Sequence, residues 1–398
     1  MADVAERLEV PHFSLAERDR RWARVRALMA RDGIDVIVAP PHTGHHDHFS
    51  ANVRYLTGLG GFSLEVGAVF PREGEVTAVT VPDVTPAHWR GRQDWVSDVR
   101  SNGRAFGDGI VARLRELGAD GQRIGLAGLA HICRFPDGLV PVQLYEKLRA
   151  AFPRAELVDA TRLLDEARFV KSDEELAFLQ RGIQLVERAI EVMTREARPG
   201  VPSCVVYARV LASMIEQGGE VPTMIMWNVG PPGWPLLGPM PTQRPLAPGD
   251  VISAEIEGRW GGYVAQVTQQ AVLGRVPPEY AEMFAIQQAA LAACWERLRP
   301  GVTLGELAAL TERFVAGTPY RARLIMHGRG LGDDAPMFIF SDEEMRDWVI
   351  EANAVFMVKP VIMTEGRTRN VVWGDSVVAT PTGARRLGTR PPEIIEIA

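Results

Sequence analysis

The sequence contains few cysteines, no long apolar run and no dense cluster of basic residues. Its three cysteines lie far apart and form no Cys-x-x-Cys pair, which argues against a disulfide framework or a zinc knuckle. No stretch of 18 apolar residues is present and the N-terminal segment is charged, so neither membrane insertion nor export is indicated. The net charge is −6, and nucleic acid is not an expected partner. These absences predict a cytoplasmic protein that binds neither nucleic acid nor membrane.

The composition that remains is that of an ordinary globular protein, with 46% hydrophobic and 24% charged residues. Because single cores stop growing at roughly 250–300 residues, a chain of 398 residues is expected to form two domains. Residues 1–165 alternate strand and helix patterns, which predicts an α/β domain. The clearest signal there is a capping-box pattern at Ser14 and Glu17 that opens a helix to Arg31, followed by a strand pattern over Asp35–Ala39.

The pattern changes near residue 165, where helices and strands separate into longer runs. After Ser172, apolar residues recur at helical spacing through Met193. Helices on a mostly antiparallel sheet predict an α+β domain over residues 166–398. The further helices are expected at Ser203–Gln217, Pro278–Leu298 and Leu304–Val315, and the strands at Val251–Ile256, Tyr263–Leu273, Ala354–Met363 and Val371–Ala379.

Four stretches of the second domain carry a family resemblance: Gly249–Gly274, His327–Gly330, Lys359-Pro360 and Trp373–Asp375. In order and spacing they resemble the active-site stretches of the pita-bread enzymes, the superfamily of creatinase, prolidase, aminopeptidase P and methionine aminopeptidase (peptidase family M24). The resemblance implies a pita-bread catalytic-type domain preceded by a smaller α/β domain of the creatinase N-terminal type. It also implies a homodimer in which the N-terminal domain of one subunit reaches the site of the other.

Most of the metal ligands of that superfamily are replaced in this chain. Where the resemblance implies Asp, Asp, His, Glu and Glu, the sequence has Glu255, Gln266, His327, Lys359 and Gly374. The charge at these positions changes from −4 to −1 + 1 = 0. A lysine ammonium at roughly 4 Å repels a divalent cation by about 2–8 kcal/mol, so we expect no metal and no other cofactor.

Creatinase, the metal-free precedent that the resemblance offers, differs as well. Its catalytic histidine falls at Gly238, its two glutamates at Thr268 and Lys359, and its substrate-binding arginine at Leu64. A direct copy of creatine hydrolysis is therefore not expected.

Three side chains are the candidate catalytic groups. Glu255 occupies a ligand position and is predicted to be a nucleophile or general base, and His327 a proton shuttle because imidazole titrates near neutrality. Lys359 is predicted to bind a substrate carboxylate. The alternatives are a solvated strand face for Glu255, a stabilising role for His327, and a structural ion pair of Lys359 with Glu255 or Asp375.

A second group of side chains is predicted to contact the substrate, because these residues lie near the catalytic candidates or in segments that reach the partner's site. The polar run His42–His48 could equally be a plain loop. The predicted substrate contacts are Glu257, Gln266, Thr268, Gln269, Arg329, Asp334, Trp227, Phe62, His45 and His48.

Together these features predict a metal-independent hydrolase that cleaves a C–N bond, such as an amide or cyclic amidine. Its substrate would be a small polar, carboxylated metabolite. Three alternatives remain open: an Xaa-Pro dipeptidase or aminopeptidase, a lyase acting on a small metabolite, and a non-catalytic binding module.

Overall fold

The computed structural model describes residues 11–41, 50–60, 66–81, 85–103, 105–129, 137–233, 240–339 and 343–398. The chain divides into two compact units, one of Met1–Phe169 with Leu331–Ala335 and one of Val170–Gly330 with Pro336–Ala398. The division falls at Phe169, four residues beyond the predicted domain boundary at 165. Each unit is described by itself.

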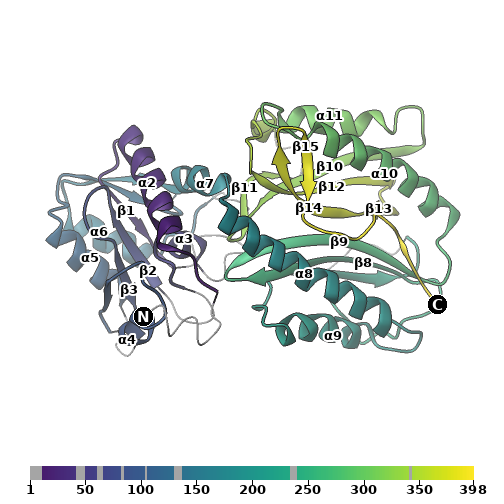
Figure 1. The fold of residues 1–398 in the computed structure, drawn as a ribbon, viewed down its shortest axis with the longest axis horizontal. Coiled ribbons are helices and arrows are strands. Elements are labelled where there is room, and N and C mark those ends of the chain that lie inside the picture. Colours follow the sequence, from purple (N-terminus) through teal and green to yellow (C-terminus); the bar gives the residue numbers. More distant parts are fainter. Residues whose placement is uncertain are drawn as a thin grey trace. The chain divides into compact units, whose positions relative to one another are not determined.

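The first unit is built around a six-stranded mixed sheet in the order β4-β3-β2-β1-β5-β6 (Figure 1). Its strands are β1 (Val36–Ala39), β2 (Val66–Pro71), β3 (Thr77–Thr80), β4 (Asp98–Ser101), β5 (Arg123–Leu126) and β6 (Glu156–Asp159). Its helices are α2 (Leu15–Asp32), α3 (Ala51–Thr57), α4 (Thr85–Arg90), α5 (Phe106–Glu116), α6 (Val142–Ala151) and α7 (Thr161–Phe169). The predicted cap of α2 is present, because the Glu17 amide donates to the Ser14 hydroxyl at 3.1 Å.

The second unit contains the larger sheet, in the order β11-β10-β12-β14-β9-β8-β7, with β13, β15 and β16 paired at its sides. Its strands are β7 (Ile225–Gly230), β8 (Val251–Trp260), β9 (Tyr263–Leu273), β10 (Tyr320–Arg329), β11 (Asp333–Phe338), β12 (Val355–Thr364), β13 (Asn370–Val372), β14 (Gly374–Thr380), β15 (Gly383–Arg386) and β16 (Ile395–Ile397). Its helices are α8 (Asp173–Glu196), α9 (Ser203–Glu216), α10 (Pro278–Arg297) and α11 (Leu304–Arg313).

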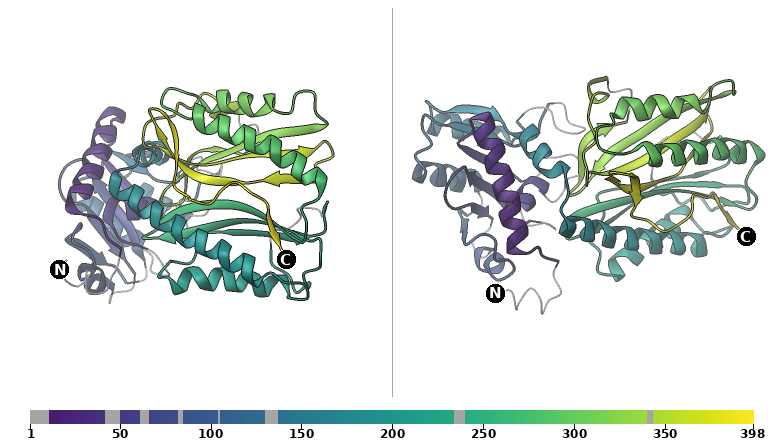
Figure 2. Two further views of the ribbon diagram at one scale, coloured as in Figure 1. Left: turned by 45° about the vertical axis from the view of Figure 1, so that its right-hand side comes forward. Right: turned by 45° about the horizontal axis from the view of Figure 1, so that its top comes forward.

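Helices and sheet of the second unit pack in the way the α+β prediction requires (Figures 1 and 2). Helix α8 lies on β8 and β9, and α10 lies on β12, while α9 packs against α8 and α11 against α10. A full capping box at Ser172 and Glu175 fixes the start of α8. No helix in the described ranges is long and apolar enough to cross a membrane.

A glycine–glycine contact sets the distance between α8 and β8. A Cβ atom on Gly258 would lie 2.2 Å from the carbonyl oxygen of Gly182 and 2.9 Å from Val186. Side chains alternate along a strand, so residues an even number of positions from Gly258, such as Ile256, face α8. Glu255, an odd number of positions away, faces the opposite side. The close contact with α8 therefore decides which face of β8 carries the polar side chains.

We expect Gly258→Ala to destabilise the protein by at least about 2 kcal/mol, because the added methyl group meets helix backbone that cannot rotate away. The matched control is Gly366→Ala, where the nearest atom lies at 3.9 Å, with an expected change within about 0.5 kcal/mol. Urea unfolding of both variants measures the difference. Equal midpoints for the two variants would show that the contact is not close.

Candidate active site

Glu255 of β8 and Lys359 of β12 form an ion pair on the sheet face opposite α8. The Lys359 Nζ atom lies 2.5 Å from Oε2 of Glu255, and the two side chains are 3% and 19% exposed. The Gln266 amide donates to the same oxygen at 2.8 Å. The structure thus brings together three positions that the sequence selected, and it realises the ion pair that was one of the alternatives for Lys359.

The surroundings of Glu255 keep its carboxyl group ionised. Burial raises the pKa of Glu255, but the charge and hydrogen bond of Lys359, the charge of His327 and the Gln266 amide together outweigh it. The resulting pKa lies below the ordinary value for glutamate. At neutral pH this group is therefore an anion and a proton acceptor, and it is not a proton donor.

His327 lies on β10, next to the strand that carries Lys359. It is 2% exposed, and its backbone is in register with Met357 of β12. The Nδ1 atom is 3.4 Å from the carbonyl oxygen of Gly328. Because its charge acts on Glu255, the third predicted catalytic group belongs to the same electrostatic cluster.

Gly374 of β14 lies too close to β12 for a side chain. A Cβ atom at Gly374 would lie 2.6 Å from Cβ of Lys359, 2.6 Å from Cε of Met357 and 2.7 Å from the carbonyl oxygen of Val358. Real Cβ atoms essentially never approach so closely. A side chain of any kind therefore has no room at position 374 unless Met357 and the β12 backbone shift.

These residues do not fit a dinuclear metal centre. Within the described ranges, no three side chains of His, Cys, Asp or Glu converge as metal ligands. The one carboxylate of the cluster, Glu255, already accepts from the Lys359 ammonium, and an amide supplies only a weak neutral donor at Gln266. The donor set is that of an internal ion pair.

Among the described residues, two buried polar atoms on this face have no hydrogen-bond partner. They are Oε1 of Gln266 and Oγ1 of Thr268, both on fully buried side chains of β9. Thr268 is in register with Glu255, so both atoms lie beside the ion pair. Since an unsatisfied buried polar group costs about 1–3 kcal/mol, a ligand or water that bonded to these atoms would be favoured.

Three predicted substrate contacts have partners within the second unit. Glu257 accepts from Arg329 at 2.8 Å and from the Met224 amide at 3.0 Å, so the predicted contacts Glu257 and Arg329 neutralise each other in the interior. Gln269 lies on the other face of β9, because side chains alternate, and its amide donates to the Gln270 and Glu393 carbonyl oxygens.

Two further predicted contacts also have internal partners. Trp227 is fully buried and donates to the Ser203 hydroxyl at 3.0 Å, which places it in the core against α9. Asp334 groups with the first unit, where it pairs with Arg168. His45, His48 and Phe62 lie outside the described residues, as does Gly238.

Sequence reasoning missed two side chains on this face. Ser253 precedes Glu255 by two residues on β8 and shares its face, and Asn228 of β7 is in register with Ser253. The period-2 alternation of β8 was the available signal for Ser253. Asn228 was hidden because β7 was not predicted.

Comparison with known proteins matches both units. Residues 172–381 match the model of metallopeptidase family M24, and residues 21–170 match the creatinase/prolidase N-terminal domain. The sequence is 26% identical over 247 residues to a probable dipeptidase, PepE, of Mycobacterium tuberculosis, covering 60% of this chain and 63% of that protein, which is less than two thirds of its length.

Solved structures show the same fold. Dipeptidase PepE from Mycobacterium ulcerans has a TM-score of 0.75 at 23% identity and covers 97% of this chain and 100% of its own. The prolidase from Pyrococcus horikoshii has a TM-score of 0.76 at 18% identity, with 94% and 99% covered. The predicted fold class, with its creatinase-type N-terminal domain, is confirmed.

These comparisons overturn the main functional expectation from the sequence. A metal-independent hydrolase of a small metabolite was expected, whereas the matching family is one of metallopeptidases and the relatives are named dipeptidase and prolidase. The peptidase alternative is the one that these findings favour. The family resemblance is confirmed, and the preference for a small-metabolite hydrolase over a peptidase was wrong.

We expect Glu255→Gln to lower stability by about 3–5 kcal/mol at neutral pH, because it leaves the Lys359 ammonium buried without its counter-charge. Folding lowers the pKa of Glu255. The ionised carboxylate therefore contributes its full stabilisation above the pKa of the unfolded chain, about 4.3, and this stabilisation is lost as the pH falls through the pKa of the folded protein. The stability gap between wild type and variant should therefore close in acid.

Urea unfolding at steps from about pH 7 to about pH 3 measures this gap. The control is Glu365→Gln, which removes an ion pair whose carboxylate side chain is 79% exposed, and which should change stability by no more than about 1 kcal/mol at any of these pH values. A gap for Glu255→Gln that stayed constant across the range would contradict the depressed pKa.

Proposed function

Because the chain belongs to metallopeptidase family M24, we propose that this hydrolase cleaves the peptide bond of a short peptide on the sheet face that carries Glu255. The observation that carries the proposal is the grouping on one face of an ionised carboxylate, an ammonium group and two unpartnered buried polar atoms. The names of the dipeptidase relatives support the substrate class.

The polar groups of this face complement those of a peptide. The Lys359 ammonium can donate to a carbonyl oxygen or to the terminal carboxylate of a dipeptide, while Oε1 of Gln266 and Oγ1 of Thr268 can accept from peptide N–H groups. Binding would therefore satisfy both atoms that lack a partner in the free protein. Holding the peptide bond in a fixed orientation is itself a large part of the rate enhancement in such reactions.

Hydrolysis also needs a proton acceptor and a proton donor. Glu255, ionised at neutral pH, is placed to take a proton from a water molecule as its oxygen bonds to the carbonyl carbon. His327 can return a proton to the amine nitrogen when the C–N bond breaks. In this proposal Glu255 is the proton acceptor and His327 is the proton donor.

A second candidate function is peptide binding without turnover. It is favoured by the Lys359–Glu255 pair, because an acceptor held at 2.5 Å by an ammonium group is a weakened base. The same side chains would then recognise the ligand, and the protein would act as a binding module. The predicted homodimer and cytoplasmic location remain predictions.

Incubation of the purified full chain with a panel of dipeptides, Xaa-Pro dipeptides included, tests the proposal. The metal content is measured first, and each assay is run as purified, after EDTA treatment, and with added manganese or cobalt. We expect release of free amino acids, detected by mass spectrometry. Absence of turnover under every condition would contradict the proposal, and binding without turnover would support the second candidate.

Variants then locate the site. Glu255→Gln should lower kcat by about 10²–10⁴-fold if its carboxylate takes part in proton transfer. The matched control, Glu365→Gln, changes an exposed carboxylate and should leave kcat unchanged. Turnover that survives Glu255→Gln at the wild-type rate would place the reaction elsewhere in the chain.

A further inference from the structure

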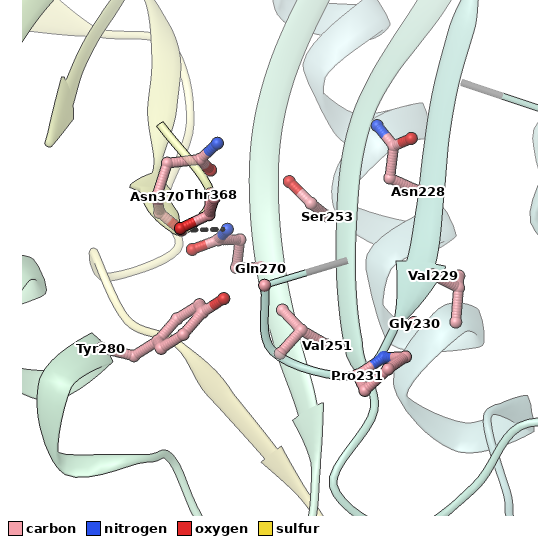
Figure 3. Close-up of a pocket in the computed structure, with 11 residues that line it drawn as sticks. Asn228, Val229, Gly230, Pro231, Val251, Ser253, Gln270, Tyr280, Thr368 and Asn370 are labelled. Carbon is pink, nitrogen blue, oxygen red and sulfur yellow. Dashed lines mark hydrogen bonds between the residues drawn. The ribbon is translucent and has the colours of Figure 1, made fainter. Parts of the chain in front are cut away.

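A small cavity of about 40 Å³ opens on the second unit at the ends of β7, β8 and β9 (Figure 3). Its polar walls come from several elements: strands β7, β8 and β9, the first turn of α10, and the segment that leads into β13. None of the described residues that line it is an Asp, Glu, Lys, Arg or His. Polar side chains among its lining residues include Asn228, Ser253, Gln270, Tyr280 and Asn370.

The register places this cavity beside the ion pair. Ser253 is opposite Asn228 on one side and Gln270 on the other, so the three side chains form one row across the sheet. Glu255 follows Ser253 by two residues on the same face of β8, a separation of roughly 7 Å along the strand. One side chain of an extended peptide spans such a distance when its backbone lies at Glu255.

The polar groups of the cavity are not equally available. The Gln270 amide donates to the Asn370 carbonyl oxygen at 3.2 Å and accepts from the Val372 amide at 3.3 Å, which fixes it as part of the wall. In contrast, the Asn228 amide and the Ser253 hydroxyl make no hydrogen bond to another described residue. Figure 3 shows these two side chains side by side on neighbouring strands, with the Tyr280 hydroxyl directed toward the sheet.

Size and polarity together define what the cavity can hold. A water molecule needs about 10–15 Å³ of such space, so about 40 Å³ accommodates a group of roughly three non-hydrogen atoms. A charged group would lose its hydration, and Arg369 beside Gly233 is already paired with Glu279 at 2.8 Å. An apolar group would leave the Asn228 amide and the Ser253 hydroxyl unpaired. A neutral group with both a donor and an acceptor satisfies all of these conditions.

We propose that this cavity is a specificity pocket that takes a carboxamide side chain of the peptide bound at Glu255 and Lys359. The Asn228 amide and the Ser253 hydroxyl pair with the carboxamide, and the Gln270–Asn370 wall sets the depth. This inference rests on the proposed function, because the pocket belongs to the same site. It adds the class of side chain that the site selects.

Titration calorimetry with dipeptides that pair glycine with Asn, Asp or Leu, in both orders, tests the pocket. The three side chains have nearly the same shape and differ in charge and hydrogen bonding. We expect the better-bound Asn dipeptide to bind about tenfold more tightly than its Leu and Asp counterparts, the effect of one satisfied hydrogen-bond pair. Equal affinities for the three side chains, or no binding of any, would overturn the pocket.

Two variants assign the preference to named groups. Asn228→Leu and Ser253→Ala should each reduce the preference for Asn over Leu to about twofold or less while affinity for the Leu dipeptide is retained. Ser213→Ala, a matched change in α9 whose hydroxyl bonds the Val210 carbonyl oxygen, should keep the full preference. Unchanged selectivity in both pocket variants would overturn the assignment.

The pocket and the proposed hydrolysis can fail separately, because affinity and turnover are measured independently. Selective binding of the Asn dipeptide without release of amino acids would support the pocket assignment and contradict the proposed peptidase activity. Turnover of dipeptides without side-chain preference would support the peptidase activity and contradict the pocket assignment.

Discussion

The ion pair between Lys359 and Glu255 is the interaction on which the rest of the site depends. It joins β12 to β8 across the two strands that lie between them, β14 and β9. Each intervening strand contributes to this region: Gly374 of β14 lies close to β12 at position 359, and Gln266 of β9 donates to the same carboxylate oxygen. Because a buried charge without its partner is costly, neither Lys359 nor Glu255 can be replaced alone without loss of stability.

This ion pair gives the residues at positions 255 and 359 a common explanation. A lysine at 359 requires a counter-charge, which Glu255 supplies. Position 374, where glycine is found, lies too close to β12 for a side chain. The remaining polar atoms of the face, on Gln266 and Thr268, are left without partners. The result is a neutral, hydrogen-bonding surface in a family whose name refers to metallopeptidases.

Much of the fold could be predicted because its signals are local. Strand β9 has the bounds that the sequence predicted, and α2 and α8 begin at the serines that cap them. Strand β7 was missed because its mixed polar and apolar residues show no clear period. Strand β10 was missed although apolar and polar residues alternate over Tyr320–Leu324, which was the available signal. The expected strand over Val371–Ala379 is divided at Trp373, where the chain passes from β13 beside β12 to β14.

Some features of the candidate site could likewise be predicted from the sequence, and others could not. The sequence by itself determined the family resemblance, the alternation that puts Ser253, Glu255 and Glu257 on one face of β8, and the loss of charge at the five ligand positions. Only the tertiary structure decided which charges meet: Glu255 with Lys359, Glu257 with Arg329, and Asp334 with Arg168. The physical reason is that these partners are brought together by strand order, strand register and chain folding, which act between residues far apart in the sequence. The spacing of neighbouring residues in the sequence therefore does not predict which charged residues pair.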